Sequence, residues 1–131
     1  MKLLLDTHIW VWTVLQPDRL SRRVSRAIEN TANQIWLSPV SVWELSMLVK
    51  KGRIDLKKSV DQWTADTFES LQIQEASVTT DVALAMNKIR LPHEDPADAF
   101  LVATASVFEL TLVTADEKLL AFKHISTLAN H

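Results

Sequence analysis

Leu3-Leu4-Leu5-Asp6, close to the amino terminus, is the stretch that decides the fold. Three consecutive leucines with no polar residue between them are typical of a strand that is buried on both faces, as in a parallel sheet. The apolar run ends at Asp6. Two further short apolar runs, Ile35-Trp36-Leu37 and Leu112-Val113, are predicted to be strands of the same sheet.

Helices are predicted between these strands, because apolar residues recur there every three or four positions and polar caps or prolines mark helix starts. Residues 9–15, a stripe from Val82 to Ile89 and a short segment from Asp116 are helical by this pattern. Other helices begin at Ser21, Ser38-Pro39, Ser59 and Asp95-Pro96. Residues 72–76 and 125–128 are predicted to be additional strands. This alternation predicts an α/β layered domain with a mainly parallel central sheet, and 131 residues fit a single domain over residues 1–131.

The chain contains one glycine, Gly52, and no cysteine. Rossmann and P-loop phosphate sites and the nucleophile elbow of serine hydrolases all need more glycines than this. The lack of cysteine excludes thiolate nucleophiles, disulfides and cysteine-bound zinc. The chemistry must therefore use carboxylates, histidines, hydroxyls or basic groups. Gly52 itself is predicted to cap the helix that begins at Ser38-Pro39.

The charge is nearly balanced, with 14 Lys and Arg against 16 Asp and Glu and a net charge of −2. No apolar run approaches the roughly 20 residues of a membrane span, and the leucines before Asp6 are too few for a signal-peptide core, so a cytoplasmic location is expected.

Basic residues cluster in two parts of the sequence. Each cluster is interpreted either as a solvated surface or as a track for nucleic-acid phosphates. They are Arg19, Arg22, Arg23 and Arg26 in one part, and Lys50, Lys51, Arg53, Lys57 and Lys58 in the other.

Four carboxylates have positions that a solvated surface does not explain. Asp6 and Asp116 follow predicted buried strands, at the edge of a parallel sheet where ligands bind. Glu44 and Asp98 lie among apolar residues on their predicted helices, where a bare charge costs several kcal/mol. Each has a structural alternative: helix capping for Asp6 and Asp116, an ion pair with an arginine for Glu44, and a capping box begun by Asp95 for Asp98.

Together these acids predict a metal site. Separate elements would aim them at the same edge of the sheet, where clustered carboxylates repel one another and raise each other's pKa. A divalent cation removes this conflict. Oxygen ligands, without cysteine or a histidine pair at ligand spacing, favour Mg²⁺ or Mn²⁺ over zinc. Such a site fits phosphoryl chemistry in which a metal-activated water attacks phosphorus.

Four motifs, in this order, resemble those of PIN domains, in particular the small VapC-type toxins of bacterial toxin–antitoxin pairs. They are residues 4–8 (Leu-Leu-Asp6-Thr7-His8), 38–45 (Ser-Pro-Val-Ser-Val-Trp-Glu44-Leu), 91–98 (Leu-Pro-His-Glu-Asp-Pro-Ala-Asp98) and 112–116 (Leu-Val-Thr-Ala-Asp116). The resemblance covers essentially the whole chain. It implies a three-layer α/β/α fold and Mg²⁺- or Mn²⁺-dependent endoribonuclease activity on RNA.

The resemblance also implies which residues act and what they meet. It carries catalytic and metal-binding roles over to Asp6, Glu44, Asp98 and Asp116, and it places Thr7, Ser38 and Thr114 at positions that support the site. A homodimer is implied, as is a cognate antitoxin in a groove near the acids. Five tryptophans in so short a chain likewise predict that some of them lie at an interface.

Two features near the motifs are interpreted separately. Ala99 follows Asp98 where similar proteins often have arginine, so a phosphate contact or ion pair of that guanidinium is in doubt. His8 and His93 are interpreted as hydrogen-bonded structural residues rather than as bases.

Two other functions stay open at this point. An aspartyl-phosphate protein would use Asp6 as phosphoacceptor, although Asp6-Thr7-His8 lacks the second aspartate of such phosphatases and no lysine closely follows Leu112-Val113-Thr114. A catalytically inert PIN-like binding module would keep the fold without the chemistry. The presence of all four acids argues against this second alternative.

Overall fold

The computed structural model describes residues 1–91 and 95–131 and contains a five-stranded parallel sheet. The strands are β1 (Lys2–Leu5), β2 (Gln34–Leu37), β3 (Gln74–Glu75), β4 (Thr111–Thr114) and β5 (Ser126–Ala129), in the order β3-β2-β1-β4-β5. Leu3 of the central strand pairs with Ile35 on one side and Thr111 on the other. The chain leaves β1 toward β2 and β3 and later returns to build β4 and β5 on the other side. The topological switch point, where parallel sheets bind ligands, therefore lies between β1 and β4.

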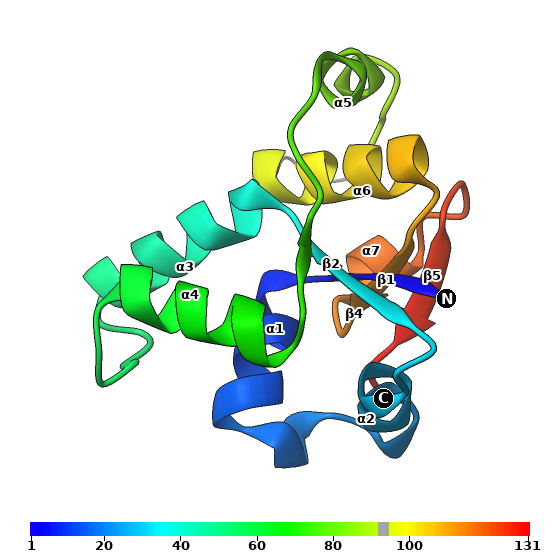
Figure 1. Cartoon of the computed structure of the whole chain (residues 1–131). Coiled ribbons are helices and arrows are strands. Elements are labelled where there is room, and N and C mark those ends of the chain that lie inside the picture. The colour runs from blue at the N-terminus through cyan, green and yellow to red at the C-terminus, as the bar shows by residue number, and fades with distance from the viewer. Residues whose placement is uncertain (92–94) are drawn as a thin grey trace.

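Helices cover both faces of this sheet (Figure 1). On one face lie α1 (Thr7–Leu15), α2 (Arg22–Glu29), α3 (Pro39–Lys50) and α4 (Val60–Ser70), with a short 3₁₀ helix, η1 (Pro17–Arg19), after α1. On the other lie α5 (Thr80–Met86), α6 (Pro96–Phe108) and α7 (Glu117–Leu120). Leu3 and Leu5 belong to the core under α1 to α4, whereas Leu4 packs into the core under α6. The three-layer α/β/α fold with a parallel sheet is therefore confirmed, and the leucine run is buried on both faces.

Two elements are clearly shorter in the structure than predicted. The strand expected over residues 72–76 is reduced to Gln74–Glu75, because Gln72 has a φ of 52° and β3 is an edge strand that pairs only with β2. The helix expected to reach Ile89 ends at Met86, since the amides of residues 87–89 bond to carbonyls three residues back, as in a 3₁₀ turn.

The predicted end of α3 at Gly52 is confirmed. Gly52 follows the last helical turn with a φ of 71°, and its amide donates to the Val49 carbonyl. The left-handed conformation is one that glycine adopts at little cost and other residues do not.

The tryptophans divide between core and surface. Trp10 and Trp63 are buried with ring centroids 5.0 Å apart, and the Trp10 indole donates to Thr67 Oγ1 at 3.0 Å. Trp43 is 60% exposed on α3. Whether an interface covers it stays a prediction. In the described part of the chain, no helix combines the length and the apolar character that crossing a bilayer requires.

Candidate active site

Asp6 and Asp116 stand on either side of the switch point, directly after β1 and shortly after β4. A buried threonine at the end of β4 connects them. Its hydroxyl, Thr114 Oγ1, donates to Asp6 Oδ2 at 2.7 Å and accepts from the backbone amide of Asp116 at 3.0 Å. The side chain of Asp6 and the backbone of Asp116 are thus fixed to the same residue.

A second threonine connects Asp6 with Glu44. Thr7 is the first residue of α1; its amide donates to Asp6 Oδ1 and its hydroxyl to Glu44 Oε1, both at 2.7 Å. Glu44 reaches this point because α3 begins at Ser38-Pro39 and carries it into the second helical turn. Thr7 and Thr114 are almost fully buried, so the donor of each hydrogen bond to a carboxylate is shielded from water.

Asp98 approaches from the other helical layer. It lies in the first turn of α6, and its negative charge, like that of Asp6, raises the pKa of Glu44. The structure therefore brings the four predicted acids, Asp6, Glu44, Asp98 and Asp116, to one edge of the sheet, and α1, α3, α6 and the end of β4 each supply or flank one of them.

The environment opposes the charge on two of these acids. Burial raises the pKa of the Asp6 carboxyl, and the Asp116 carboxylate adds to that rise, while hydrogen bonds from Thr114 and Thr7 act in the opposite direction. Burial also raises the pKa of Glu44, with the neighbouring carboxylates adding to it and the Thr7 hydroxyl opposing it. A cation placed among these groups would favour their charged forms.

The capping interpretations of Asp6 and Asp116 are confirmed. Asp6 accepts the first amide of α1, and Asp116 Oδ1 accepts the Lys118 amide at 2.9 Å at the start of α7. A carboxylate oxygen has two lone pairs, so a cap can still bind a further ligand. Capping and clustering are therefore compatible at both positions.

The ion-pair alternative for Glu44 is not observed. Within residues 1–91 and 95–131, the ion pairs join Lys57 with Asp55 and Lys58 with Asp66. Glu44 instead faces other carboxylates.

Asp95 is a further carboxylate that the sequence identified only as a cap. It does cap α6, accepting the Ala97 amide at 3.0 Å, and its charge also contributes to the raised pKa of Glu44. The Asp-Pro pair indicates the cap, but only the packing of α3 against α6 brings Asp95 near Glu44.

Three other positions from the motifs have simple surroundings. Ser38 is buried and its hydroxyl accepts the Val40 amide at 3.1 Å, so it positions α3 rather than any carboxylate directly. Ala99 is half-buried on α6 and offers no cation. His8 is exposed beside Asp6, and His93 lies outside the described residues.

The donor set suits a hard divalent cation, because the cluster offers carboxylate oxygens and hydroxyls. In the part of the chain that the structure describes, no three Asp, Glu or His side chains already form a group able to hold an ion. Thr7 links the carboxylates of Asp6 and Glu44, whereas Thr114 links the Asp6 carboxylate to the backbone of Asp116. Side-chain rotation would have to complete a coordination shell.

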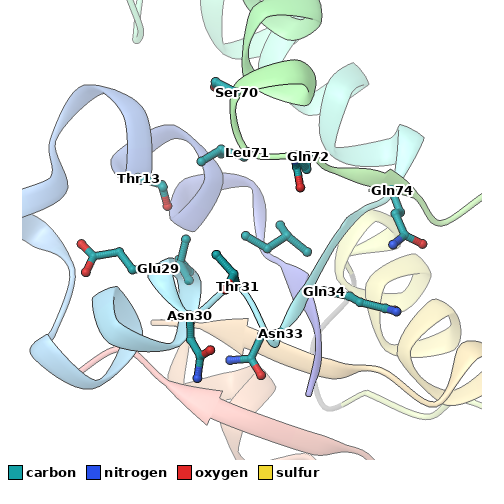
Figure 2. Close-up of a pocket in the computed structure, with 12 residues that line it drawn as sticks. Thr13, Glu29, Asn30, Thr31, Asn33, Gln34, Ser70, Leu71, Gln72 and Gln74 are labelled. Carbon is teal, nitrogen blue, oxygen red and sulfur yellow. The ribbon is translucent and has the colours of Figure 1, made fainter.

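A polar hollow at the opposite edge of the sheet is a different surface (Figure 2). It has a volume of about 630 Å³, and Asn30, Asn33, Gln34, Gln72 and Gln74 are among the residues that line it. Gln34 and Gln74 begin their strands, whereas Asp6 and Asp116 follow strand ends and Glu44 and Asp98 lie in the first two turns of α3 and α6. None of the four acids lines this hollow.

The family model for the PIN domain matches residues 3–126. The chain belongs to the PIN domain family. Among its relatives, this PIN domain is 34% identical over 124 residues to Ribonuclease VapC22 of Mycobacterium tuberculosis, with 92% of each chain covered.

Solved structures share the fold of this PIN domain. VapBC2 from Rickettsia felis, bound to a DNA fragment from its promoter, aligns with a TM-score of 0.75 at 18% identity, covering 98% of both chains. DNA-bound VapBC from Salmonella typhimurium aligns with a TM-score of 0.66 at 17% identity, also over 98% of both chains. At these identities the likeness shows the fold alone.

Proposed function

We propose that this PIN domain is the toxin of a toxin–antitoxin pair and acts as a Mg²⁺- or Mn²⁺-dependent endoribonuclease. The observation that carries the proposal is the set of four acids at the switch point, two of them held by buried threonine hydroxyls, in a chain 34% identical to a ribonuclease. An inert binding module gains nothing from keeping repelling carboxylates together, because their burial raises the pKa values of Asp6 and Glu44 and disfavours the charged forms.

Asp6, Glu44, Asp98 and Asp116 are the residues that would hold the cation. When bound, a divalent cation supplies positive charge at the scissile phosphate and lowers the pKa of water, so that hydroxide is available near neutral pH. Water attacks phosphorus, the bond to one bridging oxygen breaks, and that oxygen leaves with a proton.

The chain's own contribution is to hold the acids charged and correctly oriented. Thr114 donates to Asp6 and Thr7 donates to Glu44, and a donated hydrogen bond favours the carboxylate over the neutral acid. Both donors are buried, which fixes their rotamers by packing. Ser38 contributes indirectly, because its hydroxyl caps the start of α3, the helix that carries Glu44.

The partners follow from the same relationship. The structural neighbours include complexes named VapBC, and we propose a cognate antitoxin as the partner of this chain and a homodimer as its oligomeric state. RNA as the substrate and a cysteine-free sequence fit a cytoplasmic location.

The test is RNA cleavage by the purified full chain with Mg²⁺ or Mn²⁺, compared with cleavage in EDTA. Asp6→Asn and Asp98→Asn are each expected to lower the cleavage rate by about 100-fold or more. Removing a metal ligand should reduce activity at least as much as removing a group that only orients one. Asp81→Asn, which removes an exposed carboxylate from α5, is the matched control and is expected to cleave like the parent chain.

Equal cleavage by all of these proteins, or cleavage that EDTA leaves unchanged, would refute the mechanism. Failure of the parent chain to cleave RNA or to bind Mn²⁺ by calorimetry would support an inert PIN module instead. A stable phosphate ester found on Asp6 would support the aspartyl-phosphate alternative.

A further inference from the structure

We propose that a groove between α1 and the segment after α3 binds single-stranded RNA beside the carboxylates, by stacking on Trp12 and Arg19 and by phosphate contacts to Arg19 and Arg53. The groove has a volume of about 630 Å³. This inference rests on the ribonuclease function proposed above and adds the surface that holds the substrate.

One wall of the groove is a face of α1. His8, Val11, Trp12 and Leu15 line it, at the spacing that places residues on one side of a helix. The other wall is formed by Leu48 of α3 together with Arg53, Ile54, Asp55 and Lys57. With a rise of 1.5 Å per residue, the wall from His8 to Leu15 extends about 10 Å along the helix.

The groove lies next to the candidate active site, although none of the four acids lines it. His8 lies two residues after Asp6 and directly after Thr7, which donates to Glu44. On the facing wall, Leu48 lies one helical turn after Glu44 on α3. A strand of RNA with its scissile phosphate at the acids can therefore continue into this groove.

Arg19 lies over the ring of Trp12 within the groove. The guanidinium carbon of Arg19 lies 4.3 Å from the ring centroid of Trp12, and the His8 ring lies 5.8 Å from Trp12 on centroids. Arg19 is exposed, so the outer side of its guanidinium can extend the stack by one base. Unstacked RNA bases bind to aromatic rings and arginine planes in this way, with little dependence on sequence.

The charge of the groove favours a polyanion. Arg19, Arg53 and Lys57 line it, against the single carboxylate of Asp55. Asp55 pairs with Lys57 at 2.9 Å in full solvent, whereas neither arginine has an ion-pair partner among the described residues. Arg19 and Arg53 are 34 positions apart in the numbering and belong to different basic parts of the sequence, so only the fold makes them one surface.

The experiment measures binding apart from cleavage. A short fluorescein-labelled single-stranded oligoribonucleotide is titrated with the full chain in EDTA, and anisotropy is recorded over a series of salt concentrations. Arg19→Gln and Arg53→Gln are expected to weaken binding about tenfold and to reduce the slope of log affinity against log salt by about one each. Arg22→Gln and Arg23→Gln remove the same charge from exposed positions on α2, outside the groove, and are expected to change little.

Stacking is tested separately from charge. Trp12→Phe keeps an aromatic ring and is expected to retain binding, whereas Trp12→Leu is expected to lose about tenfold. Trp12 also packs against the core, so the melting temperature of each Trp12 variant is first compared with that of the parent chain. If Trp12→Leu melts at a lower temperature, the binding result of Arg19→Gln decides the test.

The outcomes separate this inference from the proposed function. If the parent chain cleaves RNA but the groove variants bind like the α2 controls, the groove inference is wrong and the ribonuclease function stands. If the groove variants lose RNA binding while the parent chain cleaves nothing, the groove is supported and the function is wrong. If the groove variants keep their affinity for RNA and lose affinity only for the antitoxin, the groove binds the antitoxin protein and the inference is overturned.

Discussion

Replacing Thr114 by valine tests whether a buried hydroxyl keeps Asp6 charged and in place. Valine has nearly the same shape as threonine, so the substitution removes the hydroxyl with little change in packing at a fully buried position. It deletes the 2.7 Å bond to Asp6 Oδ2 and leaves the Asp116 amide without its acceptor.

The expected loss of stability follows from these two contacts. A hydrogen bond to a charged group contributes about 1.5–3 kcal/mol, so Thr114→Val is expected to cost about 2 kcal/mol. For a chain of 131 residues this lowers the midpoint of thermal unfolding by about 7 °C. Cleavage is expected to fall by about 10- to 100-fold, the usual effect of removing a group that orients a metal ligand.

The pH dependence has a definite direction. The Thr114 hydroxyl lowers the pKa of Asp6 against the effect of burial, so removing it raises that pKa further. Activity that requires the Asp6 carboxylate rises as pH increases through this pKa. The acidic limb of the pH–rate profile of Thr114→Val is therefore expected to move to higher pH.

Thr104→Val is the matched control for this variant. Thr104 is also fully buried, but its hydroxyl donates to the Phe100 carbonyl within α6 at 2.7 Å and touches none of the four acids. Thr104→Val is expected to change stability slightly and the pH profile not at all. If the two variants have the same pH–rate profile, the reasoning about Asp6 is refuted.

Three further predictions concern charge, metal and backbone. Burial raises the pKa of Glu44 above its ordinary value of 4.5, so the neutral side chain stabilises the fold fully below pH 4.5 and this stabilisation is lost as the pH rises and the carboxyl ionises. In the absence of metal, Glu44→Gln should therefore melt a few degrees above the parent chain at neutral pH, and the two melting temperatures should converge in acid. An unchanged or lower melting temperature at neutral pH would contradict this. Mn²⁺ at about 100 times its dissociation constant should raise the free energy of unfolding of the parent chain by about 2.7 kcal/mol, measured by thermal unfolding. The same concentration should stabilise Asp98→Asn far less, and equal stabilisation would show that Asp98 is not a metal ligand. Gly52→Ala should cost about 1 kcal/mol in urea unfolding and leave cleavage unchanged, because a Cβ meets no atom within 4 Å and only the φ of 71° opposes it; a loss near zero would show that this turn relaxes.

Much of the fold could be predicted because short-range chemistry specifies it. The leucine run before Asp6, the caps at Ser21, Ser38 and Ser59, and the glycine after α3 each act within a few residues, and the structure has the expected element at each place. Predictions were weakest where a long-range partner decides the boundary. The length of the strand predicted over residues 72–76 depends on how many residues of β2 pair with it, and the local sequence pattern does not encode that number.

The candidate site divides in the same way. That Asp6, Glu44, Asp98 and Asp116 are out of place on a solvated surface was readable from their neighbours. The hydroxyl contacts were not readable in this detail: Thr7 meets Glu44 across 37 positions and Thr114 meets Asp6 across 108. The Thr114 contact depends on the strand order that puts β4 beside β1, and the Thr7 contact depends on the packing of α1 against α3.

The sequence by itself determined the identity of the elements, the chemistry available to the chain and the family to which its motifs point. These follow from local apolar pattern, from capping and from the absence of cysteine and of all but one glycine. Only the tertiary structure decided which charged groups meet, namely the acids joined through Thr7 and Thr114, and Arg19 with Arg53 along the groove. The physical reason is that sheet order and helix packing are set by burial of apolar surface, which is non-directional. The polar groups carried by those elements meet wherever that packing brings them together.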